Sequence, residues 1–125
     1  MLTQGLAEPE PTRVLLVDDN LDAADMLAEL LRVMGHDVTV AHDGPSALAA
    51  QWGLPPAVAL LNIGLPVMDG YELARQLRSR HPQMRLVALT GYGQESDRIQ
   101  SRNAGFDAHL VKPVDLPALN EVLTF

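Results

Sequence analysis

The chain has 125 residues, 47% of them hydrophobic and 20% charged, with a formal net charge of −7. This length suits a single globular domain, which buries about two-thirds of its unfolded surface and needs no metal or disulfide to hold its core. The lack of cysteine excludes thiol chemistry and thiolate metal sites, and the acidic balance argues against nucleic acid or anionic membrane as the main partner.

The first eleven residues read as a linker or disordered tail, and the folded domain is predicted to span residues 12–125. The segment lacks hydrophobic periodicity and ends in Glu8, Pro9, Glu10 and Pro11. It also lacks the basic-then-apolar order of a signal peptide, and no apolar stretch in the chain approaches the roughly 20 residues that span a bilayer. We therefore expect a cytoplasmic protein without membrane contact.

Five short apolar runs are predicted to be parallel strands. Each run is continuously apolar rather than alternating, which is typical of strands buried on both faces, and helical patterns separate them. This rhythm predicts an α/β fold, in which right-handed βαβ units form one doubly wound, five-stranded parallel sheet flanked by helices. The runs are residues 14–17, 38–41, 58–61, 86–89 and 108–111.

The first helix is predicted to begin after Asn20 and to end at Gly35, a natural left-handed stop. Three- and four-residue spacing defines its expected inward stripe. That stripe comprises Ala23, Leu27, Leu30, Leu31 and Met34.

Later helices carry similar signals. Asp69, followed by Glu72, predicts a capped helix that ends before Pro82, and its arginines at 75, 78 and 80 are interpreted as a solvated face. Asp115 is predicted to cap the last helix. A weaker helical pattern covers residues 44–51, and another helix is expected to begin around Glu95.

Polar residues follow four of the apolar runs. Ligands of open parallel sheets bind beyond the carboxyl ends of the strands, and a strand order of 2-1-3-4-5 would make these four ends neighbours. Adjacent carboxylates favour a hard cation such as Mg²⁺, and the chain's one lysine offers a compact charge for phosphate. These residues are Asp18 and Asp19, Asn62, Thr90 and Lys112.

Four segments together resemble the receiver domain of two-component response regulators and hybrid histidine kinases. They are VDDN at 17–20, LNIGLPVMDG at 61–70, ALTG at 88–91 and VKP at 111–113. The resemblance implies a flavodoxin-like fold that takes a phosphoryl group from a histidine kinase or histidine phosphotransfer protein. It also implies an influence on other domains of the same polypeptide.

The resemblance further assigns roles to individual residues. Asp18 and Asp19 would hold Mg²⁺ together with the phosphoacceptor position at Asn62 and the backbone carbonyl of Gly64. Thr90 and Lys112 would contact the phosphoryl group, with Gly91 and Pro113 as accessory residues. His109 stands where the family carries a switching aromatic, although a strand histidine with one edge in water is the simpler interpretation. The Lys112–Pro113 bond resembles the family's cis peptide.

Asn62 departs from the family, which carries an aspartate there. Its amide is neutral and a poor nucleophile, so the chain as written is not expected to form an acyl phosphate. For unit charges about 4 Å apart, the lost attraction is on the order of 4 kcal/mol at a typical effective dielectric, before desolvation offsets it. Mg²⁺ should therefore bind more weakly. We interpret the chain as a phosphoacceptor module, not an enzyme in the ordinary sense, that is locked in its unphosphorylated state; the alternative is a natural pseudo-receiver acting by protein interaction alone.

Other features of the sequence are weaker. Tyr92 is either a cover for the pocket mouth or an exposed loop residue. Met26 and Val33 stand on the outer face of the first helix, where the family docks phosphodonor helices.

Overall fold

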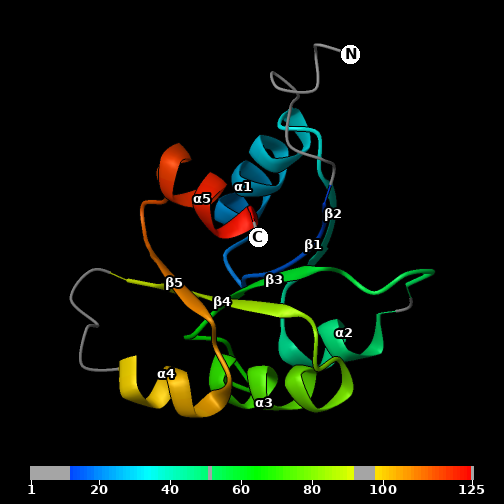
Figure 1. Cartoon of the computed structure of the whole chain (residues 1–125), viewed down its shortest axis with the longest axis vertical. Helices are drawn as coiled ribbons and strands as arrows, with labels where there is room; N and C mark the ends of the chain where they lie inside the picture. Colours follow the sequence, from blue (N-terminus) through cyan, green and yellow to red (C-terminus); the bar gives the residue numbers. More distant parts are fainter. Residues whose placement is uncertain (1–11, 51, 92–97, 125) are drawn as a thin grey trace.

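The computed structural model describes residues 12–50, 52–91 and 98–124. Strands and helices alternate along the chain (Figure 1). Their bounds are β1 Arg13–Val17, α1 Leu21–Val33, β2 Asp37–Ala41, α2 Gly44–Ala49, β3 Val58–Asn62, α3 Gly70–Arg80, β4 Arg85–Thr90, α4 Arg98–Ala104, β5 Ala108–Val111 and α5 Leu116–Leu123.

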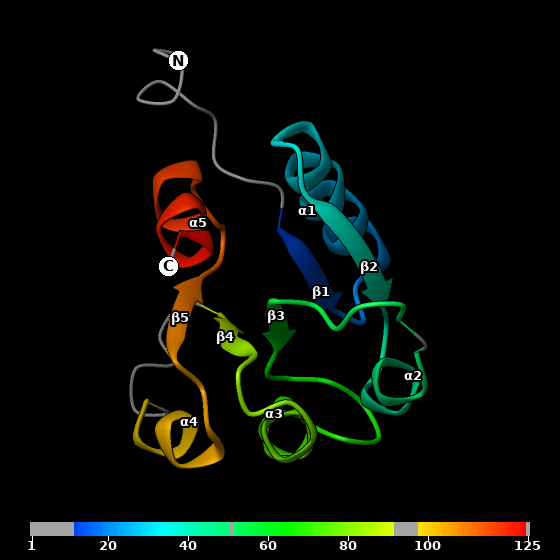
Figure 2. The same ribbon diagram turned by 45° about the vertical axis from the view of Figure 1, so that its right-hand side comes forward.

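The five strands form one parallel sheet in the order β2-β1-β3-β4-β5. Figure 2 shows α1 and α5 on one face of this sheet and α2, α3 and α4 on the other. This arrangement confirms the predicted doubly wound fold and its strand order. Each strand therefore delivers its carboxyl end to the same edge, where β1, β3, β4 and β5 are neighbours.

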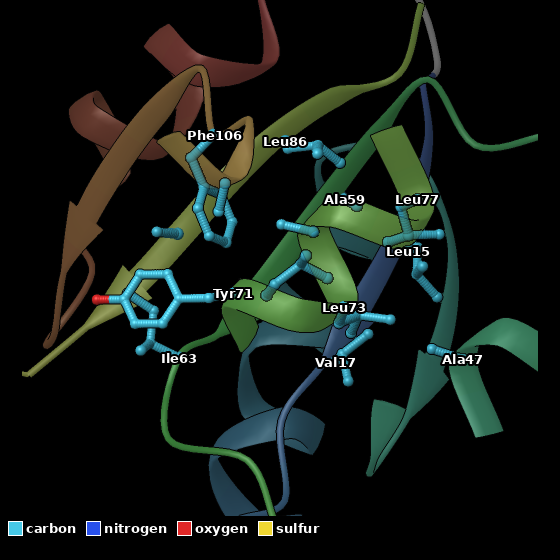
Figure 3. Close-up of a cluster of buried hydrophobic side chains, with 14 of the residues drawn as sticks. Leu15, Val17, Ala47, Ala59, Ile63, Tyr71, Leu73, Leu77, Leu86 and Phe106 are labelled. Atoms are coloured by element: carbon cyan, nitrogen blue, oxygen red, sulfur yellow. The ribbon is translucent and has the colours of Figure 1, made fainter. Parts of the chain in front are cut away.

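Two hydrophobic cores flank the sheet. One contains Tyr71, Leu73 and Leu77 of α3, packed against inward residues of the strands such as Leu15 (Figure 3). The other lies under α1 and α5 and includes Leu31. None of the helices formed by the described residues is long and apolar enough to cross a membrane.

The three central strands are buried on both faces of the sheet, but the two edge strands, β2 and β5, are not. β1, β3 and β4 are buried over nearly their whole length, whereas Thr39 of β2 and Val111 of β5 are exposed. The prediction that all five runs are covered on both faces was wrong for β2 and β5. An edge strand has a neighbour on one side only, and the flanking helices cover the middle of the sheet.

The predicted helix caps are present. Asn20, Asp69 and Asp115 each accept a hydrogen bond from the backbone N–H three residues later, and Gly35 adopts a left-handed φ of 97° after α1. Residues 92–97, which include Glu95 and Tyr92, lie outside the described residues. The expected start of the fourth helix and the proposed cover of the pocket mouth therefore cannot be placed.

The inward stripe of α1 is rotated from the predicted one. The buried residues are Ala24, Ala28 and Leu31, while Ala23 is half-buried. The predicted Leu27, Leu30 and Met34 are partly buried and flank the core. Small alanines let the helix approach the sheet closely, so the large side chains flank the contact rather than fill it.

Arg78 is not part of a solvated face, in contrast to the prediction. Its guanidinium donates to the carbonyls of Pro82, Met84 and Gly105 at 2.7–2.8 Å and to Asp107 at 2.7 Å. These bonds join the end of α3 to the start of β4 and to the turn before β5. Arg75, by contrast, is half-exposed and, in the part of the chain that the structure describes, pairs with Glu72 on its own helix.

Candidate functional site

The candidate site lies at the carboxyl edge of the sheet. Asp18 directly follows β1, Asn62 ends β3 and Lys112 directly follows β5. The backbone hydrogen bonds between neighbouring strands continue past the strand ends. The Asp18 N–H donates to Ala41 O at 3.1 Å, and the Lys112 N–H donates to Thr90 O at 2.8 Å. Backbone hydrogen bonds of the sheet therefore hold Asp18 and Lys112 in place independently of their side-chain contacts.

A buried carboxylate and the lysine form the centre of the site. Asp18 is only 2% exposed, and its Oδ2 accepts from Lys112 Nζ at 2.9 Å. Its Oδ1 accepts from the Asn20 N–H at 3.1 Å. A carboxylate this deeply buried requires such partners, because an unpaired charge in the interior is costly.

The Asn62 amide bridges the two aspartates and the lysine. Its Nδ2 donates to Asp19 Oδ1 at 3.1 Å and to Asp18 Oδ1 at 3.4 Å, while its Oδ1 accepts from Lys112 Nζ at 3.4 Å. The reverse orientation would set an oxygen against two carboxylates and an NH₂ group against an ammonium. Charge complementarity thus selects the observed orientation.

The other expected contact residues lie around this cluster. Thr90 is buried at the end of β4, and its hydroxyl donates to Leu110 O at 3.5 Å. Gly64 is exposed in the loop after β3, and a Cβ added there would have no neighbour within 4 Å. The Lys112–Pro113 bond is cis, and Gly91 directly follows Thr90.

His109 lies outside the cluster. Its ring is half-buried and stands 6.4 Å, centroid to centroid, from the ring of Phe106, which belongs to the core under α3 and α4. The structure thus places His109 within β5, next to Phe106, and not among Asp18, Asn62 and Lys112.

Two contributors to the site were missed by the sequence reasoning. His42 Nδ1 donates to the backbone carbonyl of Asp18 at 3.0 Å. A Cβ on Gly70 would fall 2.6 Å from Asn62 O and 2.7 Å from Ile63 Cα, so α3 approaches the end of β3 too closely for any other residue. The motif already contained Gly70, but only the packing reveals why a glycine is required.

The donor set suits a hard cation. No group of three or more His, Asp or Glu side chains gathers within the part of the chain that the structure describes. Asp18 and Asp19 nevertheless each place a carboxylate oxygen next to Asn62 Nδ2, so the two oxygens lie close together. Carboxylate oxygens are ligands that Mg²⁺ prefers. The two aspartates and Lys112 together carry a net charge of −1.

Comparison with known proteins points to one family. A family model for the response regulator receiver domain matches residues 14–124. The chain is 37% identical over 110 residues to the probable transcriptional regulatory protein TcrX of Mycobacterium tuberculosis, covering 88% of this chain and 47% of that protein. It is 36% identical to the transcriptional regulatory protein TrcR of the same organism, covering 90% of this chain and 44% of the relative. The chain thus spans about half the length of the curated relatives it matches.

Solved structures agree with this assignment. A CheY-like receiver domain protein from Methanospirillum hungatei is 32% identical with a TM-score of 0.82, covering 91% of each chain. The receiver domain of a Pseudomonas aeruginosa sensor histidine kinase, solved with a magnesium ion in its active site cleft, is 30% identical with a TM-score of 0.80. The match covers 90% of this chain and 94% of the kinase receiver. This chain belongs to the receiver domains of two-component response regulators.

Proposed function

We propose that the chain is a phosphorelay receiver module that Asn62 holds in its unphosphorylated state. The observation that carries this proposal is the bridging amide of Asn62, which joins both aspartates to Lys112. Its NH₂ group faces the carboxylates as a donor, and its neutral oxygen is a poor nucleophile. The side chain thus completes the polar network of the site but offers no anionic oxygen to attack phosphorus.

In the Asn62→Asp protein, a carboxylate would replace this amide. The histidine N–P bond of a histidine kinase or histidine phosphotransfer protein would break as the carboxylate O–P bond forms. Lys112, whose ammonium lies 3.4 Å from Asn62 Oδ1, would pair with the phosphoryl oxygens, and the Thr90 hydroxyl would exchange Leu110 O for one of them. Such a site works by positioning and charge, as an acceptor rather than a turnover enzyme.

Asp18 and Asp19 would hold Mg²⁺, with the Gly64 carbonyl as the further ligand that the resemblance assigns. When bound, the ion would neutralise charge on the phosphoryl oxygens. In the chain as written the Asn62 NH₂ group already donates to these two carboxylates, at 3.1 Å to Asp19 Oδ1 and 3.4 Å to Asp18 Oδ1, and would have to give up these hydrogen bonds for the ion to bind there. We therefore expect weaker binding of Mg²⁺ than in the Asn62→Asp protein.

The test is the intact mass of both proteins after incubation with MgCl₂ and acetyl phosphate. We expect a phosphoryl adduct only on the Asn62→Asp protein, and expect hydroxylamine to remove it, as it does an acyl phosphate. An Asn103→Asp variant is the matched control, because Asn103 is exposed on α4 and gains the same charge away from the site. Labelling of the unchanged chain would contradict the assignment of Asn62.

A second candidate is a pseudo-receiver that binds partners without phosphorylation. The observation in its favour is that the Asn62 amide and the Lys112 ammonium already donate to the carboxylates of Asp18 and Asp19, while Lys112 also donates to Asn62 Oδ1. Failure of the Asn62→Asp protein to accept phosphate would replace the first proposal with this one. In either case we propose a cytoplasmic role beside a histidine kinase, with other domains of a longer polypeptide as the output.

A further inference from the structure

A hollow of about 410 Å³ lies at the amino edge of the sheet, the edge opposite the candidate site. Two segments form it, residues 55–57 just before β3 and residues 80–84 from the end of α3 to the start of β4, and they are neighbours because β3 and β4 pair. Its volume falls within the range of small-molecule sites, about 300–1,000 Å³. The residues lining it are Pro55, Pro56, Ala57, Arg80, His81, Pro82, Gln83 and Met84.

Backbone hydrogen bonds hold both sides of this amino-edge hollow in place. On one side, Ala57 O accepts from the Arg85 N–H at 2.9 Å. On the other, the Arg78 guanidinium donates to Pro82 O at 2.8 Å and to Met84 O at 2.7 Å. Three of the lining residues are prolines, whose φ angles are fixed. The hollow is therefore preformed, and a ligand would not have to order its walls on binding.

The inner wall of the hollow is apolar. Met84 is only 3% exposed and belongs to the core under α3 and α4, and Pro56 is also buried. Pro55, Ala57 and Pro82 are exposed and form an apolar rim. A ligand with an aryl or alkyl body would remove part of this surface from water, which favours binding.

Arg80 supplies the charge. It carries the one permanent charge among the described residues that line the hollow, none of which is an aspartate or a glutamate. Its side chain is exposed, and within the described part of the chain its guanidinium donates one hydrogen bond, to Leu48 O at 3.4 Å. Arg75 and Arg78 on the same helix, by contrast, pair with carboxylates. Most of the five N–H donors of Arg80 are therefore available to a ligand.

The arginine selects the charge of the ligand. A guanidinium holds a carboxylate through two parallel hydrogen bonds, and the single positive charge of Arg80 balances its single negative charge. A phosphate dianion would bring a second charge without a charged partner among the described lining residues. A cation would be repelled by Arg80.

We propose that the amino-edge hollow binds a small organic carboxylate, with its apolar body against Pro56 and Met84 and its carboxylate paired with Arg80. Its described lining residues include neither Asp18 nor Lys112. The proposal therefore does not depend on whether the chain accepts phosphate.

The test is a nuclear magnetic resonance titration of the ¹⁵N-labelled full chain with phenylacetate. Phenylacetamide is the neutral analogue of the same shape, phenethylamine the cationic analogue and phenyl phosphate the phosphate analogue. We expect saturable shifts of the Ala57, Arg80, His81 and Met84 amides with a Kd of about 1 mM, in line with the affinity of so few atoms. The three analogues should bind about fivefold more weakly or worse, because none combines the shape with a single negative charge.

Trp52 offers a second readout. It is the chain's one tryptophan, and its ring lies 5.5 Å, centroid to centroid, from that of His81, which lines the hollow. We expect its fluorescence to change with phenylacetate at the same Kd that the amide shifts report.

Matched variants separate the hollow from the rest of the molecule. Arg80→Gln removes the charge and should weaken binding about fivefold, whereas Arg75→Gln, on the same helix but outside the hollow, should leave it unchanged. Ala57→Phe would fill the hollow and should weaken binding about tenfold. Ser46→Phe, at an exposed position of α2 outside the hollow, should have no effect. The ¹⁵N spectrum reports whether each variant is folded, and Arg80→Gln provides the test if Ala57→Phe is not.

Four outcomes would overturn the proposal. The first is shifts that fail to saturate or that scatter over the molecule. The second is equal binding of phenylacetate and phenylacetamide, which would remove the role of Arg80. The third is unchanged binding by Arg80→Gln or by folded Ala57→Phe. The fourth is tighter binding of phenyl phosphate than of phenylacetate, which would reassign the hollow to a phosphate-bearing ligand.

Discussion

Two cationic side chains anchor opposite edges of the sheet, and they do so in different ways. At the carboxyl edge, the Lys112 ammonium donates, among the described residues, to two side chains, Asp18 at 2.9 Å and Asn62 at 3.4 Å. Near the amino end of β4, Arg78 donates to three backbone carbonyls and to Asp107, all at 2.7–2.8 Å. The contacts of Lys112 join side chains to one another, whereas those of Arg78 join backbone segments.

This difference separates function from fold. A guanidinium presents several donors in a rigid fork, which suits a fixed set of carbonyls, whereas an ammonium is a compact charge that can exchange one partner for another. We expect changes at Arg78 to act mainly on stability, and changes around Lys112 to act mainly on the chemistry of the site.

The largest expected effect is that of Arg78→Ala. It removes the Arg78 donor from three carbonyls and leaves Asp107 Oδ2 with the Leu86 N–H, at 2.9 Å, as a donor. Because the Arg78 side chain is only 29% exposed, the free energy of unfolding should fall by about 3 kcal/mol. Urea denaturation measures this loss. Arg75→Ala, on the same helix but half-exposed in a pair with Glu72, should change stability by no more than about 0.5 kcal/mol. If Arg78→Ala and Arg75→Ala lower the free energy of unfolding equally, the backbone contacts of Arg78 do not stabilise the fold as proposed.

Gly70→Ala should affect both the fold and the site. The new Cβ would fall 2.6 Å from Asn62 O, so α3 or the end of β3 must shift, at a cost of about 2 kcal/mol. Gly53→Ala is the control, since a Cβ there meets nothing within 4 Å. Urea denaturation gives the stability, and the ¹⁵N spectrum should show the Asn62 side-chain amide displaced in Gly70→Ala alone. An unmoved Asn62 amide would show that the close approach does not position the site.

These two positions also mark the limits of sequence reasoning. The apolar runs and the caps at Asn20 and Asp69 predicted the strands and helices, because local patterns determine them, and the resemblance to receiver domains supplied the strand order. The same order brought Asp18, Asn62 and Lys112 to one edge. The contacts of Arg78 and Gly70 depend instead on how α3 lies against distant loops and strand ends, which no local pattern encodes. The orientation of the Asn62 amide likewise depends on three partners from other parts of the chain.

Asn62→Asp should lower stability in the absence of Mg²⁺ by about 1 kcal/mol, because it sets a third carboxylate beside Asp18 and Asp19 and removes the bridging donor. Adding MgCl₂ should restore the loss, since a ligand that binds only the folded state stabilises it. The Mg²⁺-induced change in Tm should be larger for this variant than for the parent chain or Asn103→Asp. Equal changes in all three would show that Asn62 does not govern the affinity for Mg²⁺.

The smallest expected effect concerns His36, just before β2, which ties down the start of β1. The ring is 5% exposed, its Nδ1 accepts from the Thr12 N–H at 3.1 Å, and burial lowers its pKa. In the unfolded chain histidine titrates near pH 6.5. The stability that the neutral ring contributes is therefore complete above that pH and is lost as the pH falls below it, toward the lower pKa of the folded state.

Urea denaturation at pH 7.5 and at about pH 5.5 should show this loss in the parent chain. His36→Asn keeps an acceptor in place of Nδ1 but cannot titrate, so its stability should depend less on pH. His81→Asn, at a half-buried site outside this contact, should keep the parent's dependence. If His36→Asn loses as much stability as the parent over this interval, the Thr12 contact does not respond to pH. The pH dependence of stability over this interval would then come from groups other than His36, and the contact at the start of β1 would act only through its geometry.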